Sequence, residues 1–252
     1  MKFFDSHAHL SSPEVLPHLS EILKRAAQAG VDQIINICTC KKTLEEGLAH
    51  KLLNAGATTP HDVEKEGEQY FPLFEKAAKD GLLVAIGETG LDYYYKELNR
   101  KVQQKFLVRY LHLAAELNLP VIFHCREAFT DLFSIVDQEY PKGAPAILHC
   151  FTGTEEEAEG VFQRGWHLSL SGIVTFKKSE SLLNVAKLAP IDQLLIETDT
   201  PYLAPQSKRG KQNEPAFVVE TAASIAEVRG VSLASIAEKT YQNGNQLFRL
   251  NL

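Results

Sequence analysis

Short apolar runs alternate with amphipathic segments along the whole chain. The runs are rich in β-branched and aromatic residues and predict strands, whereas the segments between them carry apolar residues at helical spacing. The predicted strands cover residues 3–9, 33–38, 82–86, 120–123, 145–148, 167–171 and 193–196. The predicted helices cover residues 17–29, 44–53, 71–79, 99–117, 128–139, 154–164, 178–188, 216–229 and 232–248. The pattern weakens over residues 54–67, which we interpret as a short strand that ends in a loop.

About eight strand–helix units therefore follow one another in 252 residues, without a linker or a low-complexity segment. This organisation favours one domain over residues 1–252, a single (β/α)8 TIM barrel of the α/β class. Residues 82–86 are apolar on both faces, as a parallel strand between two layers requires. No Gly-x-Gly-x-x-Gly follows the first strand, which counts against an open doubly wound sheet.

The carboxyl ends of the strands form the active face of such a barrel. Imidazole and carboxylate groups follow five of the predicted strands, and both are ligands for divalent metals. The candidates are His7, His9, Glu88, His124, His149 and Asp199. Six ligands are more than one ion takes from protein when a position stays open for substrate, so we predict a two-metal site. The expected division is His7, His9 and Asp199 around one ion, His124 and His149 around the other, and Glu88 bridging them.

Two carboxylates precede ligands by two residues. Asp5, His7 and His9 alternate at period two, which places them on one face of the first strand, and Glu197 precedes Asp199 in the same way. We expect Asp5 and Glu197 to orient the N–H of an imidazole. The alternative for each is a buried carboxylate satisfied by backbone or water.

Cysteines follow two of the candidate histidines. Neighbours on a strand point to opposite faces, so Cys125 and Cys150 are expected to pack against helices rather than to bind metal. Cys38 and Cys40 share a face, and we interpret them as small buried residues, with a soft-metal site as the alternative. The four cysteines form no C-x-x-C, so reduced thiols are expected.

Composition narrows the classes of function. No run approaches the roughly 20 apolar residues of a membrane span, so we expect a soluble cytoplasmic protein without a membrane or an obligate protein partner. The net charge is −6, which argues against coating nucleic acid by general electrostatics. Two divalent ions held by Glu88 and Asp199 would nevertheless leave the site positive, which favours an anion such as a phosphate ester. A polarised amide carbonyl fits the same site.

Basic residues near the active face are candidates for substrate contacts. Arg209 and Lys211 lie in a basic run just after the last strand, and Arg126 and His61 lie on predicted loops of the same face. The basic run is equally compatible with a solvated loop, and Arg126 and His61 are weaker candidates of the same kind. Tyr93 to Tyr95 offer rings for stacking on bases, although packing under a loop is the preferred interpretation.

Six segments together resemble the TatD-related metal-dependent hydrolases, also called TatD deoxyribonucleases. They are Asp5–Leu10, Gly87–Tyr94, His124–Ala128, His149–Gly153, Glu197–Tyr202 and Arg209–Pro215. The resemblance implies a TIM barrel, a divalent-metal site at the same six positions and deoxyribonuclease activity, in some members a 3′-to-5′ exonuclease. Where the family usually has His-Pro-His, this chain has Thr59-Pro60-His61. We expect this departure to affect the substrate range and to leave the metal ligands intact.

We therefore predict a hydrolase that cleaves phosphodiester bonds in DNA, single-stranded or at an exposed 3′ end, with two divalent ions (Mg²⁺, Mn²⁺ or Zn²⁺). A metal-activated water attacks phosphorus, and Asp199 accepts or positions its proton, with Glu88 as the second catalytic residue. The alternative is an amidohydrolase-like barrel acting on a cyclic amide or small ester, which commonly has a carboxylated lysine where Glu88 stands. A nucleic-acid-binding protein without catalysis is a third interpretation, and the complete ligand set counts against it.

Overall fold

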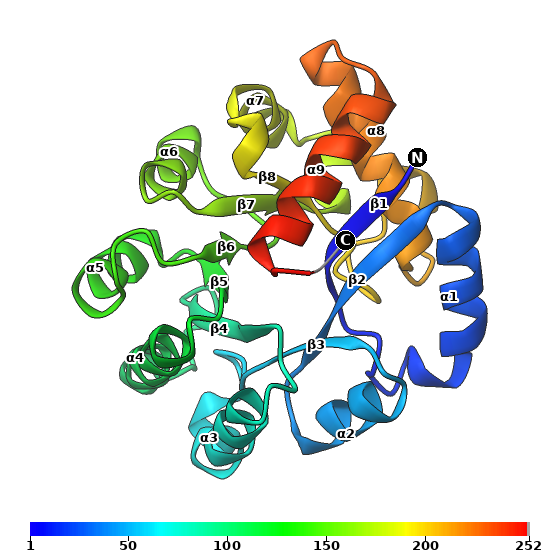
Figure 1. The fold of residues 1–252 in the computed structure, drawn as a ribbon. Coiled ribbons are helices and arrows are strands. Elements are labelled where there is room, and N and C mark those ends of the chain that lie inside the picture. Colours follow the sequence, from blue (N-terminus) through cyan, green and yellow to red (C-terminus); the bar gives the residue numbers. More distant parts are fainter. Residues whose placement is uncertain (251–252) are drawn as a thin grey trace.

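The computed structural model describes residues 1–250 as eight parallel strands with helices around them (Figure 1). The strands are β1 (Phe3–Ala8), β2 (Val31–Cys38), β3 (Leu53–Gly56), β4 (Ala85–Asp92), β5 (Val121–Arg126), β6 (Ala146–Leu148), β7 (His167–Leu170) and β8 (Leu194–Ile196). The helices are α1 (Leu19–Gln28), α2 (Lys41–Ala49), α3 (Val63–Lys79), α4 (Arg100–Leu117), α5 (Phe129–Glu139), α6 (Glu155–Gln163), α7 (Glu180–Leu188), α8 (Val218–Arg229) and α9 (Leu233–Leu247). Each strand pairs with the next in chain order, which confirms the predicted (β/α)8 barrel.

The barrel closes between its first strand and the segment that follows its last. Ala8 forms an isolated parallel bridge with Thr200. Asp199 N donates to His7 O at 2.9 Å, and His9 N donates to Thr200 O at 2.7 Å. These bonds lie at the carboxyl ends of the strands, so closure occurs at the end of the barrel that carries the predicted ligands.

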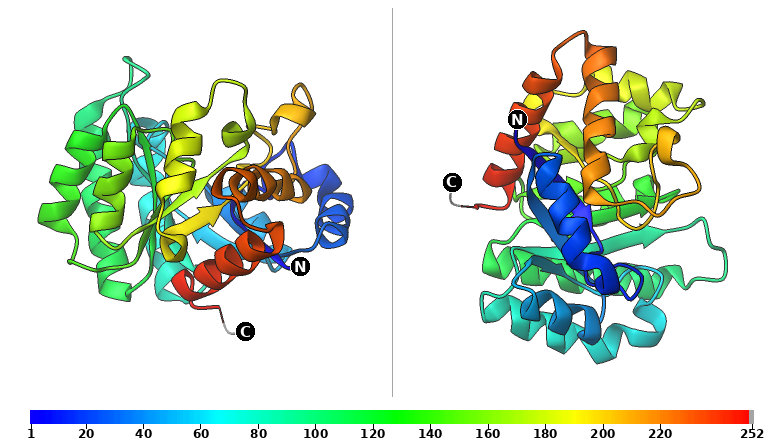
Figure 2. Two further views of the ribbon diagram at one scale, coloured as in Figure 1. Left: turned by 90° about the horizontal axis from the view of Figure 1, so that it is seen from above. Right: turned by 90° about the vertical axis from the view of Figure 1, so that its right-hand side faces the viewer.

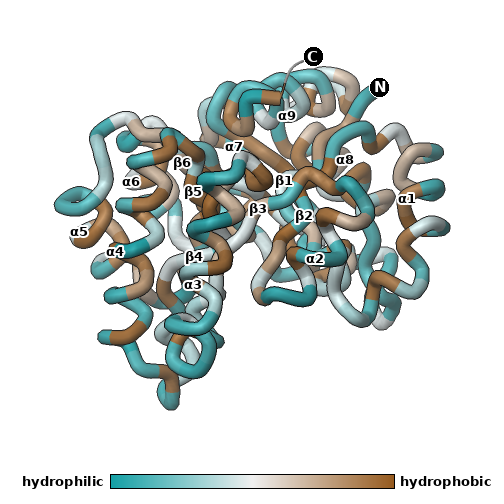
Figure 3. The backbone as a smooth tube through the Cα atoms, turned by 60° about the horizontal axis from the view of Figure 1, so that its bottom comes forward, coloured by the Kyte–Doolittle hydropathy of each residue, from teal (hydrophilic) through white to brown (hydrophobic). Residues whose placement is uncertain are grey.

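Two apolar layers follow from the alternation of side chains along the strands. Phe3 belongs to the large cluster between strands and helices, whereas Phe4 packs inside the barrel with Ile35 and Ile122. The outer helices alternate apolar and polar segments, visible along α4, α5 and α6 in Figure 3, because only one face of each meets the strands.

Helix α9 lies across the opposite end of the barrel, beside the start of β1 (Figures 1 and 2). The ring of Phe248 stacks on the ring of Phe4, with centroids 5.8 Å apart and planes within 5°. Gly244 allows this approach, since a Cβ there would lie 2.6 Å from the Phe4 ring. The helix therefore completes the interior core and leaves the ligand end open.

The sequence misplaced the boundaries of three elements. Helix α3 begins at Val63 rather than near residue 71, and Gly67 and Pro72 inside it had weakened the helical pattern. Gly67 is required there by packing, because a Cβ would lie 2.5 Å from the ring of Phe106. Strand β4 covers Ala85–Asp92 rather than residues 82–86, and α2 begins earlier than predicted. Within residues 1–250, no helix combines the length and apolarity needed to cross a bilayer.

Candidate metal centre

The six predicted ligands converge at the carboxyl ends of β1, β4, β5, β6 and β8. Five of them line a cavity of about 800 Å³ at this end of the barrel. These five are His9, Glu88, His124, His149 and Asp199. His7 lies directly behind them and is completely buried.

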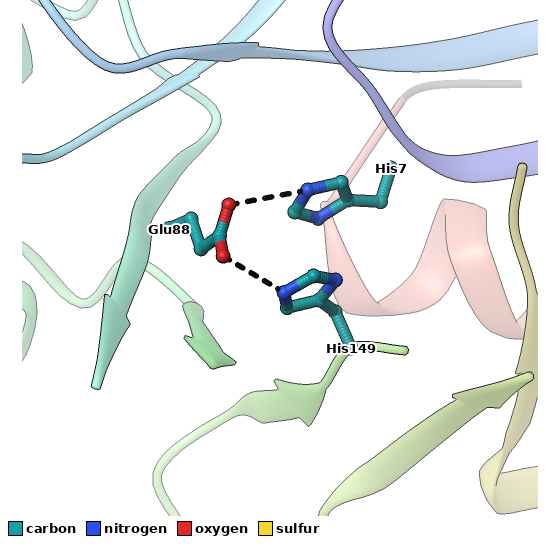
Figure 4. A group of neighbouring side chains, drawn as sticks. All are labelled: His7, Glu88 and His149. Carbon is teal, nitrogen blue, oxygen red and sulfur yellow. Dashed lines mark hydrogen bonds and ion pairs between the residues drawn. The ribbon is translucent and has the colours of Figure 1, made fainter. Parts of the chain in front are cut away.

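Glu88 stands at the centre of this group, with its two oxygens facing different sides. Oε1 lies 2.9 Å from His124 Nδ1 and 3.1 Å from His149 Nε2. Oε2 lies 3.5 Å from His7 Nε2 and 3.8 Å from His9 Nε2. Figure 4 shows the carboxylate pointing one oxygen toward His7 and the other toward His149. A carboxylate arranged in this way has the geometry of a bridging ligand.

Asp199 joins the side of the site formed by β1. Its Oδ1 lies 3.4 Å from His9 Nε2 and 3.7 Å from His7 Nε2. The residue has φ of +60°, in the left-handed region that Asp tolerates better than most residues. His7, His9 and Asp199 thus form the first ligand group expected from the sequence. Glu88 Oε2 faces the two histidines of this group as well.

An irregularity in β4 directs Glu88 inward. Gly87 pairs with Ile122 and Thr89 with Phe123, so Glu88 is an extra residue between two consecutive pairs. Such a bulge turns a side chain out of the regular alternation. Glu88 therefore projects into the barrel at a level where four imidazoles surround it.

His7 supplies the observation that bears on metal binding. Both of its ring nitrogens are buried, and neither has a hydrogen-bond partner among residues 1–250. An unsatisfied buried polar atom costs about 1–3 kcal/mol. Burial also lowers the pKa of His7 to about 4, so the ring is neutral near pH 7, as a metal ligand must be. The residues present therefore fit a divalent ion at this position.

His149 is held from two sides by carboxylates. Its Nε2 faces Glu88, while its Nδ1 lies 3.4 Å from Glu197 Oε1. Glu197 in turn accepts a hydrogen bond from Ser169 Oγ. Burial alone would lower the pKa of His149, but Glu88 and Glu197 raise it well above its usual value. Glu197 thus has the contact that the sequence predicted.

Asp5 does not have the predicted contact with an imidazole ring. It accepts hydrogen bonds from Thr198 N at 2.9 Å and Thr198 Oγ1 at 2.6 Å. The register of β1 shifts between Asp5 and Ala8, in the stretch that contains His7. Asp5 therefore stabilises the closure of the barrel, on the segment that leads to Asp199.

The sequence analysis assigned no role to Asp92, which the structure places in the site. Its Oδ2 lies 3.0 Å from His124 Nε2 and 2.9 Å from His61 Nε2. Burial alone would raise the pKa of Asp92, but the two histidines hold it well below its usual value. With His61 and His124, Asp92 forms a third group of the kind that holds metals. If the predicted strand had been continued beyond Gly90, its alternation would have placed Asp92 on the same face as Glu88.

The cysteines only partly follow the expected packing. Cys125 is buried in the outer core, yet it also lines the cavity. Cys150 lines the cavity too, because β6 ends at Leu148 and φ of +45° at Cys150 interrupts the alternation. Cys38 is buried beside Asn36 and Asn54. Cys40 begins α2 as its N-cap and is only partly buried, which the sequence did not predict.

The four candidate substrate contacts fall into two pairs. His61 and Arg126 line the cavity. Arg209 and Lys211 are exposed and do not line it. Instead, the guanidinium of Arg209 lies 4.6 Å from the ring centroid of Phe176. The structure therefore brings only the first pair to the ligands.

Comparison with known proteins agrees with this geometry. The family model described as TatD related DNase matches residues 4–249. The "Uncharacterized metal-dependent hydrolase YabD" of Bacillus subtilis is 34% identical over an alignment of 253 positions, which covers 98% of this chain and 99% of the relative. The "3'-5' ssDNA/RNA exonuclease TatD" of Pantoea vagans is 33% identical over an alignment of 261 positions, which covers 98% of this chain and 99% of the relative.

A solved structure shows the same arrangement of the chain. The TatD homolog YJJV from Escherichia coli K12 superposes with a TM-score of 0.92 at 28% identity, covering 99% of this chain and 98% of the other. The match in sequence, the barrel and its group of imidazoles and carboxylates lead to one conclusion. The chain belongs to the TatD-related DNase family of metal-dependent hydrolases.

Proposed function

We propose that this protein is a phosphodiesterase that uses two divalent ions to remove nucleotides from the 3′ end of single-stranded DNA. The observation that carries the proposal is the position of Glu88, whose two carboxylate oxygens face two different groups of imidazoles. Two ions at such a site stabilise both the attacking and the leaving oxygen of an in-line displacement, and they lower the pKa of water. The relatives named as 3′-to-5′ exonucleases support the substrate.

The protein's own residues have separate tasks in this reaction. His7, His9 and Asp199 would hold the first ion and His124 and His149 the second, with the Glu88 carboxylate available to both. Asp199 lines the cavity, and its carboxylate is placed to take the proton from the attacking water. The two ions would add positive charge beside Glu88 and Asp199, which favours an anion such as the phosphate of the substrate.

Metal-stripped protein and a 5′-labelled single-stranded oligonucleotide test this proposal. With Mg²⁺, Mn²⁺ or Zn²⁺ restored, we expect a ladder that shortens from the 3′ end. Glu88→Gln should slow it by at least about 100-fold, because even residues behind metal ligands contribute 10–100-fold. His18→Gln is the matched control, since His18 is exposed and lies outside the cavity.

Two results would contradict the proposal. One is an intact oligonucleotide when mass spectrometry confirms that the protein holds its metals. The other is cleavage by the Glu88→Gln variant at the rate of the wild type. Hydrolysis of a small ester or cyclic amide by the same preparation would then identify the amidohydrolase-like alternative.

A further inference from the structure

Exposed tyrosines surround the mouth of the cavity. Few large apolar or aromatic side chains are exposed in residues 1–250, and Tyr94, Tyr95 and Tyr202 are among them at 48%, 42% and 54%. Tyr95 and Tyr202 also line the cavity. Exposed apolar side chains gathered at one place mark a binding surface more often than scattered ones do. These rings are therefore available to a bound molecule.

The two cavity tyrosines stand beside different groups of ligands. The ring of Tyr202 meets that of His9 edge to face, with centroids 5.8 Å apart. The ring of Tyr95 meets that of His61 in the same way at 5.6 Å, and His61 is linked through Asp92 to His124. One ring thus adjoins each half of the metal centre, and Glu88 lies between the halves.

Arg126 adds a positive charge beside Tyr95. Its guanidinium lies 3.6 Å from the ring centroid of Tyr94 and 5.6 Å from that of Tyr95. Across the described part of the chain, no carboxylate lies within ion-pair distance of it. The tyrosines orient this guanidinium, and its N–H groups remain available to a phosphate.

We propose that Tyr95 and Tyr202 stack on the bases of the two nucleotides on either side of the cleaved bond, and that Arg126 contacts the adjoining phosphate. This proposal rests on the function proposed above and specifies its substrate as an unpaired 3′ end. Bases in a duplex are already stacked and paired, so their faces are not open to the rings. Stacking on a tyrosine contributes affinity on the order of tenfold per base and tolerates any base.

Binding of short oligonucleotides tests the stacking directly. The probes are a 5′-fluorescein thymidine tetramer with phosphorothioate linkages, which resist cleavage, and two versions that lack the base of the last or the next-to-last nucleotide. Anisotropy gives the Kd of each probe for the metal-loaded full chain. Loss of either base should weaken binding about tenfold. In the Tyr95→Leu variant, removal of one of these two bases should no longer change the Kd. In the Tyr202→Leu variant, removal of the other base should no longer change it.

Control variants separate stacking from a structural effect. Tyr95→Phe and Tyr202→Phe keep the ring and should keep the dependence on the base. Leu188→Ala removes an exposed apolar side chain outside the cavity and should match the wild type. If Tyr95→Leu and Tyr202→Leu weaken binding equally for probes with and without bases, the stacking proposal is overturned.

Cleavage of the unmodified tetramer is measured beside binding. Cleavage that proceeds at the same rate with and without the two bases overturns the stacking proposal alone. Base-dependent binding without any cleavage overturns the phosphodiesterase and leaves a site for single-stranded nucleic acid. The two proposals therefore fail in different measurements.

Discussion

His124 is fixed by carboxylates on both of its nitrogens. Nδ1 faces Glu88 at 2.9 Å, and Nε2 faces Asp92 at 3.0 Å. A proton on Nε2, shared with Asp92, leaves Nδ1 free as the metal ligand and sets the orientation of the ring. Asp92 would therefore act on a bound metal through His124, and it also contacts His61 in the lining of the cavity.

Replacing Asp92 should weaken metal binding without removing a ligand. In Asp92→Asn we expect metal affinity to fall by about 10–100-fold, because the ring of His124 loses its charged partner. Competition with a chelating dye measures this affinity. Asp62→Asn is the control, since Asp62 lines the same cavity but bonds to Thr59. Equal affinity in Asp92→Asn and the wild type would contradict the role of Asp92.

The six candidate ligands could be found from the sequence because each of them follows or ends an apolar run. Asp92 could not be found in this way, since Gly87 and Gly90 gave the residues around Glu88 the composition of a turn. For Asp5 the structure shows the alternative that the sequence left open, a buried carboxylate that accepts hydrogen bonds from the backbone. A register shift in β1 leaves no mark on the pattern of residues.

At the scale of single elements, β4 determines the geometry of the site. It continues beyond Glu88 only because Gly90 lets it pass close to β5. Gly90 has φ of +145°, and a Cβ there would lie 2.0 Å from the backbone oxygen of His124. The close approach of the two strands brings Glu88 and Asp92 on β4 to opposite sides of His124.

A methyl group at this position should force the strands apart. We expect Gly90→Ala to lower the free energy of unfolding by at least about 2 kcal/mol and to weaken metal binding. Gly81→Ala is a matched control, since Gly81 also has a positive φ, of +71°, but nothing lies within 4 Å of its Cβ position. Urea unfolding of both variants measures the difference. A loss in Gly90→Ala no larger than in Gly81→Ala would show that strain in φ alone is responsible.

At the scale of the whole molecule, the two ends of the barrel differ. The end near α9 is filled by apolar side chains such as Phe4 and Phe248. The other end is open, and there backbone bonds at His7, His9 and Asp199, the residues of the first candidate ligand group, join the seam of the barrel. The sequence predicted the eight units and the last helix, but no local pattern indicates that this helix covers the barrel.

Metal removal should therefore loosen the closure as well as abolish activity. A ligand at 100 times its Kd stabilises the folded state by about 2.7 kcal/mol, so chelation should lower the thermal midpoint of unfolding by several degrees. Calorimetry with and without chelator measures the shift. The Glu88→Gln variant should show a much smaller shift of the midpoint. If the midpoint of the wild type does not change on chelation, metal binding does not stabilise the closure of the barrel.

The closure also bears on how the protein is made. The seam joins His9 to Thr200, about 190 residues further along the chain. At about 5–20 residues per second, a ribosome takes roughly 10–40 s to pass from one to the other. During that time the first strand has no partner on its free edge and the first ligand group lacks its carboxylate. The nascent chain therefore acquires its complete metal centre only after most of it has been synthesised.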